Sequence, residues 1–314
     1  MVAALSVIDQ FRFFFIAWLV LGLAMAGCLY EPCFAFLTRT RGLEAKRSIT
    51  LITLVAGFAG TVSFPTANIV AEWGGWRSSM AVFSILILLV SVPLFLMGTV
   101  SEKVYKKSIG TDGESPSRKG VKKALTRPAF WLLATGFTSI AVGHGLLITH
   151  LLPLLVERSV PIGIAVTAAS LIGPMQVAGR VVMMAAERHV SMNTVCGTSF
   201  LFIICGVTAL IYANATPELV FVFVLLHGSG YGVTSITRPV VTACLLGRDG
   251  FGVISGTIAL CFMSGFALAP LLAAQIWKWG GYELMLKLTC VILLGGLAAF
   301  LLALLSVRER EAAS

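Results

Sequence analysis

Long apolar stretches follow one another along almost the whole chain, separated by short polar turns. A transmembrane helix needs about 20 consecutive, mainly apolar residues to cross the hydrocarbon core of a bilayer. Residues 1–8 are apolar but too few to cross. The stretches that are long enough lie at residues 12–37, 46–72, 78–99, 129–155, 162–186, 194–213, 217–246, 252–277 and 282–306. The pattern therefore predicts an all-α polytopic membrane protein, with the lipid bilayer as its main partner.

One long polar segment, residues 100–127, interrupts this pattern. It carries eight of the chain's 23 Lys and Arg residues together with Gly, Ser and Pro, which is typical of a flexible linker. We therefore expect three parts: a group of helices over residues 1–99, a basic linker over 100–127, and six helices over 128–314.

Composition argues against several other classes of protein. Hydrophobic residues make up 58% of the chain and charged residues 12%, whereas soluble domains are about 25% charged. The net charge of +9 does not indicate nucleic acid, because the basic residues lie between apolar stretches, without a binding motif. The seven cysteines form no CxxC pair, so we expect them to pack rather than to bind metal. We find no pattern typical of catalysis or of cofactor binding, so we expect no enzyme.

The Lys and Arg residues also predict how the chain is oriented, because cytoplasmic loops of membrane proteins carry an excess of them. With the linker placed in the cytoplasm, 16 of these residues fall on the cytoplasmic side and five on the outer side. Arg180 and Arg238 lie within apolar stretches. We expect a multi-pass protein of the cell (inner) membrane whose C-terminus is cytoplasmic.

The first three and the last three stretches resemble two copies of one unit. The motif Trp73-Gly74-Gly75-Trp76 recurs 206 residues later as Trp279-Gly280-Gly281-Tyr282. Single Gly and Pro residues recur in the same order, 205 to 208 residues apart: Gly22 and Gly228, Pro32 and Pro239, Gly42 and Gly250, Pro65 and Pro270. The repeat is therefore parallel.

This layout resembles the transporters of the major facilitator superfamily, in which two six-helix halves are related by an axis along the membrane normal. The resemblance covers nearly the whole chain. Aligned through the repeat, residues 1–8 match 207–214, the end of the third helix of the second half. We therefore expect an N-terminally truncated member (helices 4–12), with an incomplete first bundle of three helices plus a stub and a complete second six-helix bundle.

The resemblance implies that residues 12–37, 129–155 and 217–246 line the transport path. The last of these stretches carries polar residues within about 100° around its axis: His227, Tyr231, Thr234, Ser235 and Arg238. Because a polar face is costly against lipid, we expect it to face a wet cavity. The alternative is a hydrogen-bonding seam between helices.

Two opposite charges stand beside matched prolines of the repeat. Glu31, in Tyr30-Glu31-Pro32, and Arg238 each precede the proline of their own copy. Ionised side chains at membrane depth are expensive and usually functional. We hypothesise that Glu31 and Arg238 form an inner gate that pairs in one state and separates in the other. A static structural pair is the alternative.

Gln176 and Arg180 share one face of the stretch 162–186, just after Pro174. The chain loosely resembles bacterial monocarboxylate-transporter-like members, in which an arginine on this helix holds the substrate carboxylate, as a buried guanidinium can. Oxalate-type members add a lysine on helix 11, and the stretch 252–277 has none. The alternative is that Arg180 belongs to a cytoplasmic loop signature and supports packing near Glu187.

His144 lies between Gly143 and Gly145 in the middle of a path-lining stretch. A histidine there could relay a coupling proton or bind substrate, and the alternative is a hydrogen bond to a neighbouring helix. Spaced small residues predict close helix packing. These residues include Gly57, Gly60, Gly228, Gly232, Gly252 and Gly256.

Together these features predict a secondary active transporter, by symport or antiport, that moves a small solute across the membrane by alternating access. The loose resemblance to monocarboxylate-transporter-like members, through Arg180, implies an organic anion as that solute. A non-transporting truncated fragment and a membrane scaffold or sensor are the alternatives.

Overall fold

A computed structural model of the chain describes residues 1–57, 59–109, 122, 125–214, 216–247 and 250–313. These residues form helices and turns, with no strand among them. Seven of the described helices are long and apolar enough to cross a membrane. The prediction of an all-α polytopic membrane protein is therefore confirmed.

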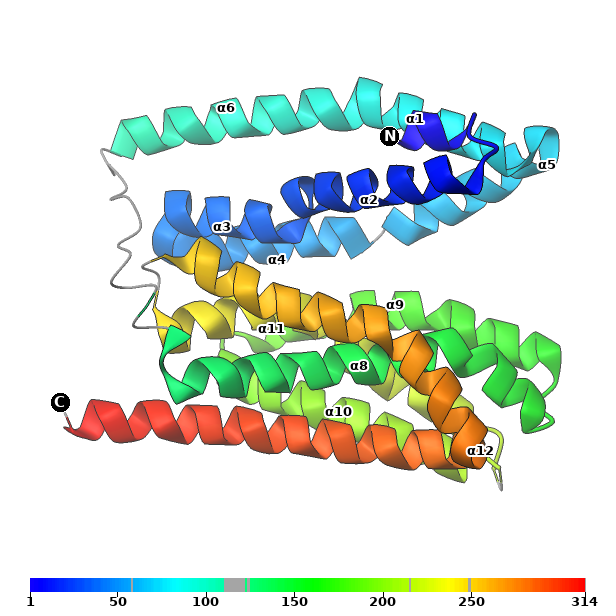
Figure 1. The fold of residues 1–314 in the computed structure, drawn as a ribbon. Helices are drawn as coiled ribbons and strands as arrows, with labels where there is room; N and C mark the ends of the chain where they lie inside the picture. The colour runs from blue at the N-terminus through cyan, green and yellow to red at the C-terminus, as the bar shows by residue number, and fades with distance from the viewer. Residues whose placement is uncertain (58, 110–121, 123–124, 215, 248–249, 314) are drawn as a thin grey trace. The chain divides into compact units, whose positions relative to one another are not determined.

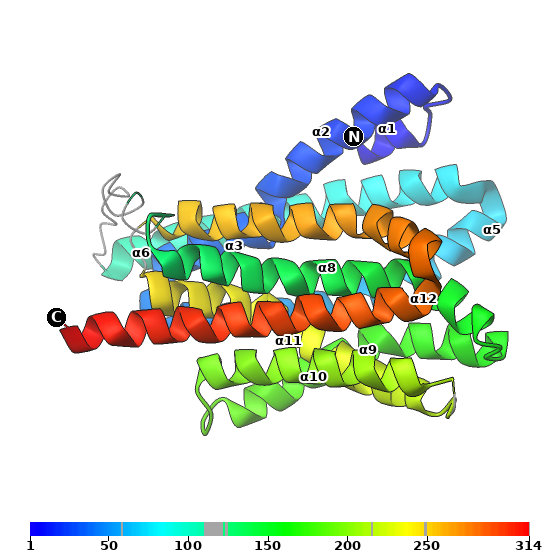
Figure 2. The same cartoon turned by 60° about the horizontal axis from the view of Figure 1, so that its bottom comes forward.

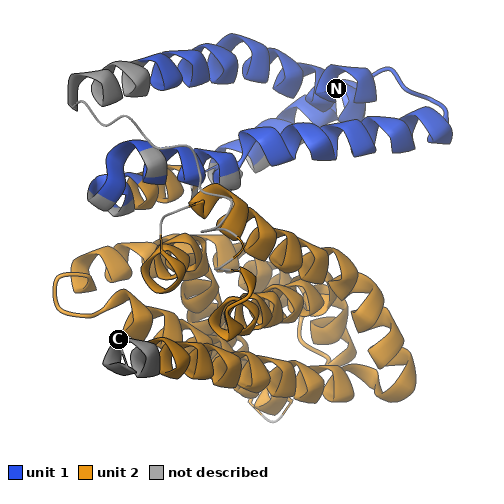
Figure 3. Cartoon of the chain, turned by 60° about the vertical axis from the view of Figure 1, so that its left-hand side comes forward, with its two compact units in different colours: residues 1–48, 58–115 blue, residues 49–57, 116–314 orange. Residues whose placement is uncertain are grey.

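The chain divides into two compact units (Figure 3). Unit 1 comprises residues 1–48 and 58–115, and unit 2 comprises residues 49–57 and 116–314. The sequence placed residues 49–57 with the N-terminal helices, whereas their contacts lie in unit 2. Hydrophobicity marks a helix but does not say which neighbours it packs against.

The helices up to the linker are α1 (Val2–Leu5), α2 (Phe11–Cys28), α3 (Tyr30–Arg41), the 3-10 turn η1 (Gly42–Glu44), α4 (Ala45–Gly57), α5 (Ala59–Leu86), the π-helical turn η2 (Ile87–Ser91) and α6 (Val92–Ile109). Figure 1 labels the α-helices. The predicted span 12–37 breaks at Leu29, which has an extended backbone. Pro32 explains the break, because its ring has no N–H and would clash with the carbonyl of Cys28 in a continuous helix.

The predicted linker begins later than expected, because α6 continues to Ile109. Residues 100–109 contain no Gly or Pro, and the first Gly of the segment is Gly110. A run without helix-breaking residues extends the helix despite its polarity. Most of the remaining linker lies outside the described residues.

Unit 2 contains five further helices: α8 (Pro128–Glu157), α9 (Ile162–Ala186), α10 (Met192–Tyr212), α11 (Leu219–Leu246) and α12 (Phe251–Ala313). The last is two helices joined by a turn at Gly280-Gly281, so it contains both predicted spans 252–277 and 282–306. Helix α8 runs between the two arms of α12, as Figures 1 and 2 show.

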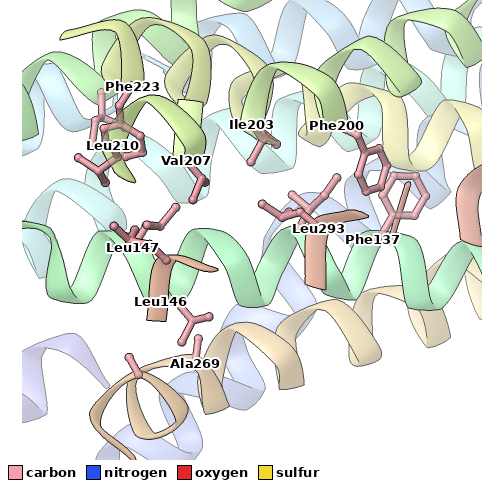
Figure 4. Packing of buried hydrophobic residues seen from close by; sticks show 14 of the residues in the cluster. Phe137, Leu146, Leu147, Phe200, Ile203, Val207, Leu210, Phe223, Ala269 and Leu293 are labelled. Atoms are coloured by element: carbon pink, nitrogen blue, oxygen red, sulfur yellow. The ribbon is translucent and has the colours of Figure 1, made fainter. Parts of the chain in front are cut away.

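The core of unit 2 is a continuous set of buried apolar side chains from α8, α10, α11 and α12 (Figure 4). Phe137 and Phe200 are almost fully buried, and the ring of Phe200 stacks on that of Phe300 at 5.8 Å. A Cβ on Gly136 of α8 would lie only 3.2 Å from the carbonyl oxygen of Gly296 on α12. These contacts fix α8 against α12.

Helices α9 and α11 approach each other even more closely, through three glycines. A Cβ on Gly228 would lie 2.7 Å from the Cβ of Met175. A Cβ on Gly179 would collide with the backbone of Ser229, and one on Gly232 with the backbone of Gln176. Small residues allow such contact between membrane helices. The spacing of Gly228 and Gly232 predicted this close approach.

The repeated motif adopts the same backbone conformation in both units. Gly75 has φ 74° and ψ 179°, and Gly281 has φ 68° and ψ −170°. Positive φ with extended ψ is accessible to glycine and strained for every other residue. The sequence repeat is therefore also a repeat of local structure, with a sharp glycine turn inside α5 and inside α12.

Candidate functional site

The polar face of α11 is buried within unit 2. His227 is 1% exposed, Arg238 7% and Thr234 3%. These side chains meet neighbouring helices instead of lipid. In the described residues this face makes a hydrogen bond to α8 and several aromatic contacts, which fits a seam between helices. The wet cavity stays a prediction.

The centre of this seam is a pair of histidines from two helices. His144 on α8 and His227 on α11 are joined by a hydrogen bond of 2.9 Å between Nδ1 of His144 and Nε2 of His227. Their rings are nearly parallel, with an interplanar angle of 10°. The sequence placed both residues on path-lining stretches, and the fold brings their imidazoles into contact.

Two glycines allow His144 to reach this position. Gly143 and Gly145 flank it, and a Cβ on either would press on α12, at 3.1 Å from Leu293 and 2.5 Å from Ala269. The α8 backbone is thus held tightly between the arms of α12. His144 itself is 6% exposed.

Aromatic rings surround the histidine pair. The ring of Tyr231, one turn after His227 on α11, stacks on His144 with centroids 3.4 Å apart. Phe223 stacks on His227 at 5.0 Å, and Phe266 from α12 lies 6.1 Å from His144. The sequence predicted Tyr231 but neither phenylalanine, because an aromatic residue within an apolar stretch cannot be distinguished from ordinary core by pattern.

One nitrogen of the pair has no hydrogen-bond partner in the described chain. Nδ1 of His227 is buried and makes no hydrogen bond to any described residue. Buried polar atoms are nearly always hydrogen-bonded, so such an atom is explained by a functional role, a bound group or an ordered water.

Arg238 lies on the same face, about three helical turns after His227. Its guanidinium lies over the ring of Phe262 on α12, 4.5 Å from the centroid, a cation–π contact that stabilises a charge away from water. The charges of Arg238 and Arg180 both act on the phenol of Tyr231. The two arginines therefore act electrostatically on the aromatic cluster through Tyr231.

Arg180 joins three segments of unit 2. Its Nε donates a hydrogen bond of 2.8 Å to the carbonyl oxygen of Gly232 on α11. Its Nη1 donates one of 3.1 Å to the carbonyl oxygen of Thr53 on α4. Gln176, one turn earlier, packs its backbone against Gly232. These contacts fit a packing role for Arg180 at α11 and α4, and its role as a carboxylate ligand stays a prediction.

The other predicted path residues lie in unit 1. Tyr30 stacks on Phe34 within α3, with centroids 5.2 Å apart. The side chain of Glu31 lies outside the described residues. Its predicted pairing with Arg238 stays a prediction from the sequence.

The glycines predicted to pack helices give a mixed result. Gly57 and Gly60 lie outside the residues whose surroundings are described. Gly252 is exposed, and no described atom lies within 4 Å of a Cβ built on Gly256. For Gly256 the described chain therefore shows no close neighbour, and its packing role stays a prediction.

Comparison with known proteins gives one result on the family. The family model of the Major Facilitator Superfamily matches residues 1–270. A search of curated proteins gives no match to the chain. The matched range contains His144, Arg180, His227, Tyr231 and Arg238.

Proposed function

The chain belongs to the Major Facilitator Superfamily, and from this premise we propose that it is a secondary active transporter that moves a small organic anion by alternating access. The observation that carries the proposal is the buried cluster of His144, His227 and Tyr231 with two arginines in unit 2. Ionisable groups inside a membrane are costly and mark substrate or ion pathways.

The chemistry of the cluster favours an anion over a neutral or cationic solute. Arg238 places a guanidinium near Tyr231, and the charge of Arg180, whose fork is held by main-chain carbonyls, adds to the positive field there. Guanidinium forks bind carboxylate and phosphate oxygens bidentately. Stacked rings beside them offer apolar contact to the carbon skeleton of a small organic acid.

Uptake by reconstituted vesicles tests the proposal. The full chain is inserted into liposomes, and a panel of radiolabelled mono- and dicarboxylates, sugars and cationic amines is offered under an imposed pH gradient. We expect saturable uptake of one or more carboxylates and little uptake of the other classes. Uptake of no solute by correctly folded protein would contradict the proposal and favour a non-transporting fragment or a scaffold.

Arg238→Gln tests whether this single residue is needed for anion transport. We expect it to reduce anion uptake at least tenfold, because a charge that binds or gates the anion contributes more than about 1.4 kcal/mol. Arg188→Gln, at an exposed site on the same chain, is the matched control and should leave uptake unchanged. Equal uptake by both variants would remove Arg238 from the mechanism.

The gate predicted from the repeat has its own test. Glu31→Gln and Arg238→Gln are compared singly and together in the same vesicles. If the two groups pair in one state of the cycle, the double variant loses less than the sum of the single losses. Additive losses, or no loss in either single variant, would exclude the gate.

A further inference from the structure

We propose that His144 and His227 form a single proton-binding site, shared between two helices, whose proton is the ion coupled to transport. This inference rests on the proposed transport function and names its coupling ion. It is carried by the contact between the two imidazoles, by their burial and by the unpartnered nitrogen of His227.

The hydrogen bond leaves two arrangements of protons in the neutral pair, and we take the one in which His227 donates. Two neutral imidazoles carry one N–H each, and one of these N–H groups lies between Nδ1 of His144 and Nε2 of His227. When His227 donates it, the proton of His144 is on Nε2, and Nδ1 of His227 is a bare acceptor. This bare nitrogen is the buried atom that has no hydrogen-bond partner in the described chain.

A proton that binds to Nδ1 of His227 completes an imidazolium without breaking any existing bond. Its Nε2–H continues to donate to Nδ1 of His144, and the bond becomes charge-assisted, which makes it stronger. A second proton would have to displace this bond and place two positive charges at the 2.9 Å contact. The pair therefore takes up one proton, not two.

The surrounding aromatic rings stabilise the positive charge that the pair carries when it is protonated. The face of Tyr231 lies 3.4 Å from the centroid of His144, and Phe223 stacks on His227 at 5.0 Å. Aromatic faces attract a cation where water is excluded. A purely structural histidine pair would need neither this aromatic surrounding nor a bare nitrogen.

The charged groups near the pair determine whether a bound anion strengthens or weakens the binding of the proton. On α11, Tyr231 and Arg238 share its face, and Arg180 approaches from α9. Among the described residues of unit 2, the ring of Phe266 on α12 lies beside His144. Gly206 on α10 packs against His227. Both arginines act on Tyr231, whose ring stacks on His144. Because like charges repel, we expect the proton to bind the pair best when an anion offsets the arginines.

Anion and proton therefore favour each other's binding, since coupling between two sites is reciprocal. The proposal predicts symport: the anion and the proton move in the same direction. An antiport mechanism would require that each ligand weakens the binding of the other.

Nuclear magnetic resonance of the full chain tests the site without any transport measurement. The chain has four histidines, so protein labelled with ¹⁵N at histidine gives few imidazole signals, which His→Gln variants assign. The protein is placed in lipid nanodiscs and titrated from alkaline to acid pH. We expect His144 and His227 to change together in a single step that corresponds to one proton.

The controls lie within the same spectra. His189 is exposed, and His189→Gln should leave the paired step unchanged. His144→Gln should abolish the paired step and shift the titration of His227. Tyr231→Phe keeps the stacked ring and should keep the single step. Two independent steps, or a pair that stays neutral until the protein unfolds, would overturn the proposal.

Vesicle uptake then separates this inference from the proposed function. If the protein transports an anion, a pH gradient should drive accumulation of the anion in vesicles that contain the native chain. His227→Gln should reduce this accumulation at least tenfold but retain the exchange of anion across the membrane. Accumulation that still follows the pH gradient in His227→Gln would overturn the coupling role. A paired titration in a chain that moves no solute would leave the proton site standing and refute transport.

Discussion

Arg180 shows how a single side chain can take a place that its sequence context does not reveal. Its position just after Pro174 suggested a carboxylate ligand or a loop residue. In the structure it donates hydrogen bonds to the carbonyl oxygens of Gly232 and Thr53. Both acceptors belong to the main chain, so the residue types in the sequence do not identify them. His144 and His227 are the opposite case, since each was predicted as a path residue and the two are in contact.

Replacement of Arg180 should destabilise the protein more than it alters solute selectivity. Arg180→Gln removes two charge-assisted hydrogen bonds, each worth about 1.5–3 kcal/mol, and we expect a clearly shorter half-life of the folded protein on heating in detergent. Arg180→Lys keeps the charge but loses the fork and should be intermediate.

Size-exclusion chromatography after heating measures the folded fraction, with Arg188→Gln as the control at an exposed site. If Arg180→Gln were as stable to heat as the native protein but lost anion uptake, Arg180 would instead be identified as a solute ligand.

Two helical glycines offer a matched pair for the close contact between α9 and α11. A Cβ on Gly232 would collide with the backbone of Gln176, whereas one on Gly256 would meet open space. Gly232→Ala should therefore cost about 1–3 kcal/mol of folding free energy, as overpacking does.

Gly256→Ala should be neutral or stabilising by up to about 1 kcal/mol, through helix propensity. Thermal unfolding followed by tryptophan fluorescence compares the two variants. Equal effects would mean that the close contact at Gly232 is not maintained in the folded protein.

At the scale of elements, the repeat predicted by the sequence has a physical basis in the glycine turns. Gly75 and Gly281 take the same positive-φ conformation in α5 and in α12, and each follows a glycine in the motif. The repeat does not extend to every element, however. Pro32 lies just after the break between two helices, whereas its match Pro239 lies inside the continuous helix α11.

Alanine at either turn glycine should destabilise its own unit. Gly75→Ala and Gly281→Ala place a Cβ on a backbone with positive φ and extended ψ, at a cost of about 1–3 kcal/mol each. Gly295→Ala, at an open position within the second arm of α12, is the control and should not destabilise.

Proteolysis at increasing temperature, with peptides identified by mass spectrometry, shows which unit opens first. The same protease sensitivity in native protein and in both turn variants would contradict the role of the glycine conformation.

At the scale of the whole molecule, apolar side chains are exposed along the outer surfaces of several helices, as a lipid environment requires. Leu94 and Phe95 on α6 are more than half exposed, and so are Leu268 and Leu271 on α12. Buried polar groups, by contrast, gather on the inner face of α11. In unit 2 the buried polar groups thus lie within a mainly apolar core, and exposed apolar side chains cover the helices outside it.

The distribution of Lys and Arg predicts that the C-terminus is cytoplasmic, because 16 of these residues fall on that side and five on the other. A fluorescent protein fused after Ser314 should therefore be bright, and alkaline phosphatase at the same place should be inactive. The opposite pattern of reporter activity would reverse the predicted orientation.

The sequence alone determined the class of the molecule, the places of most helices, the parallel repeat and the presence of costly polar residues at membrane depth. These features follow from hydrophobicity, charge and the special backbones of Gly and Pro, which are local properties. Only the tertiary structure decided that His144 meets His227, that Arg180 binds main-chain carbonyls, and that residues 49–57 belong to unit 2. Such contacts join residues far apart in the chain, and they depend on which helix faces come together.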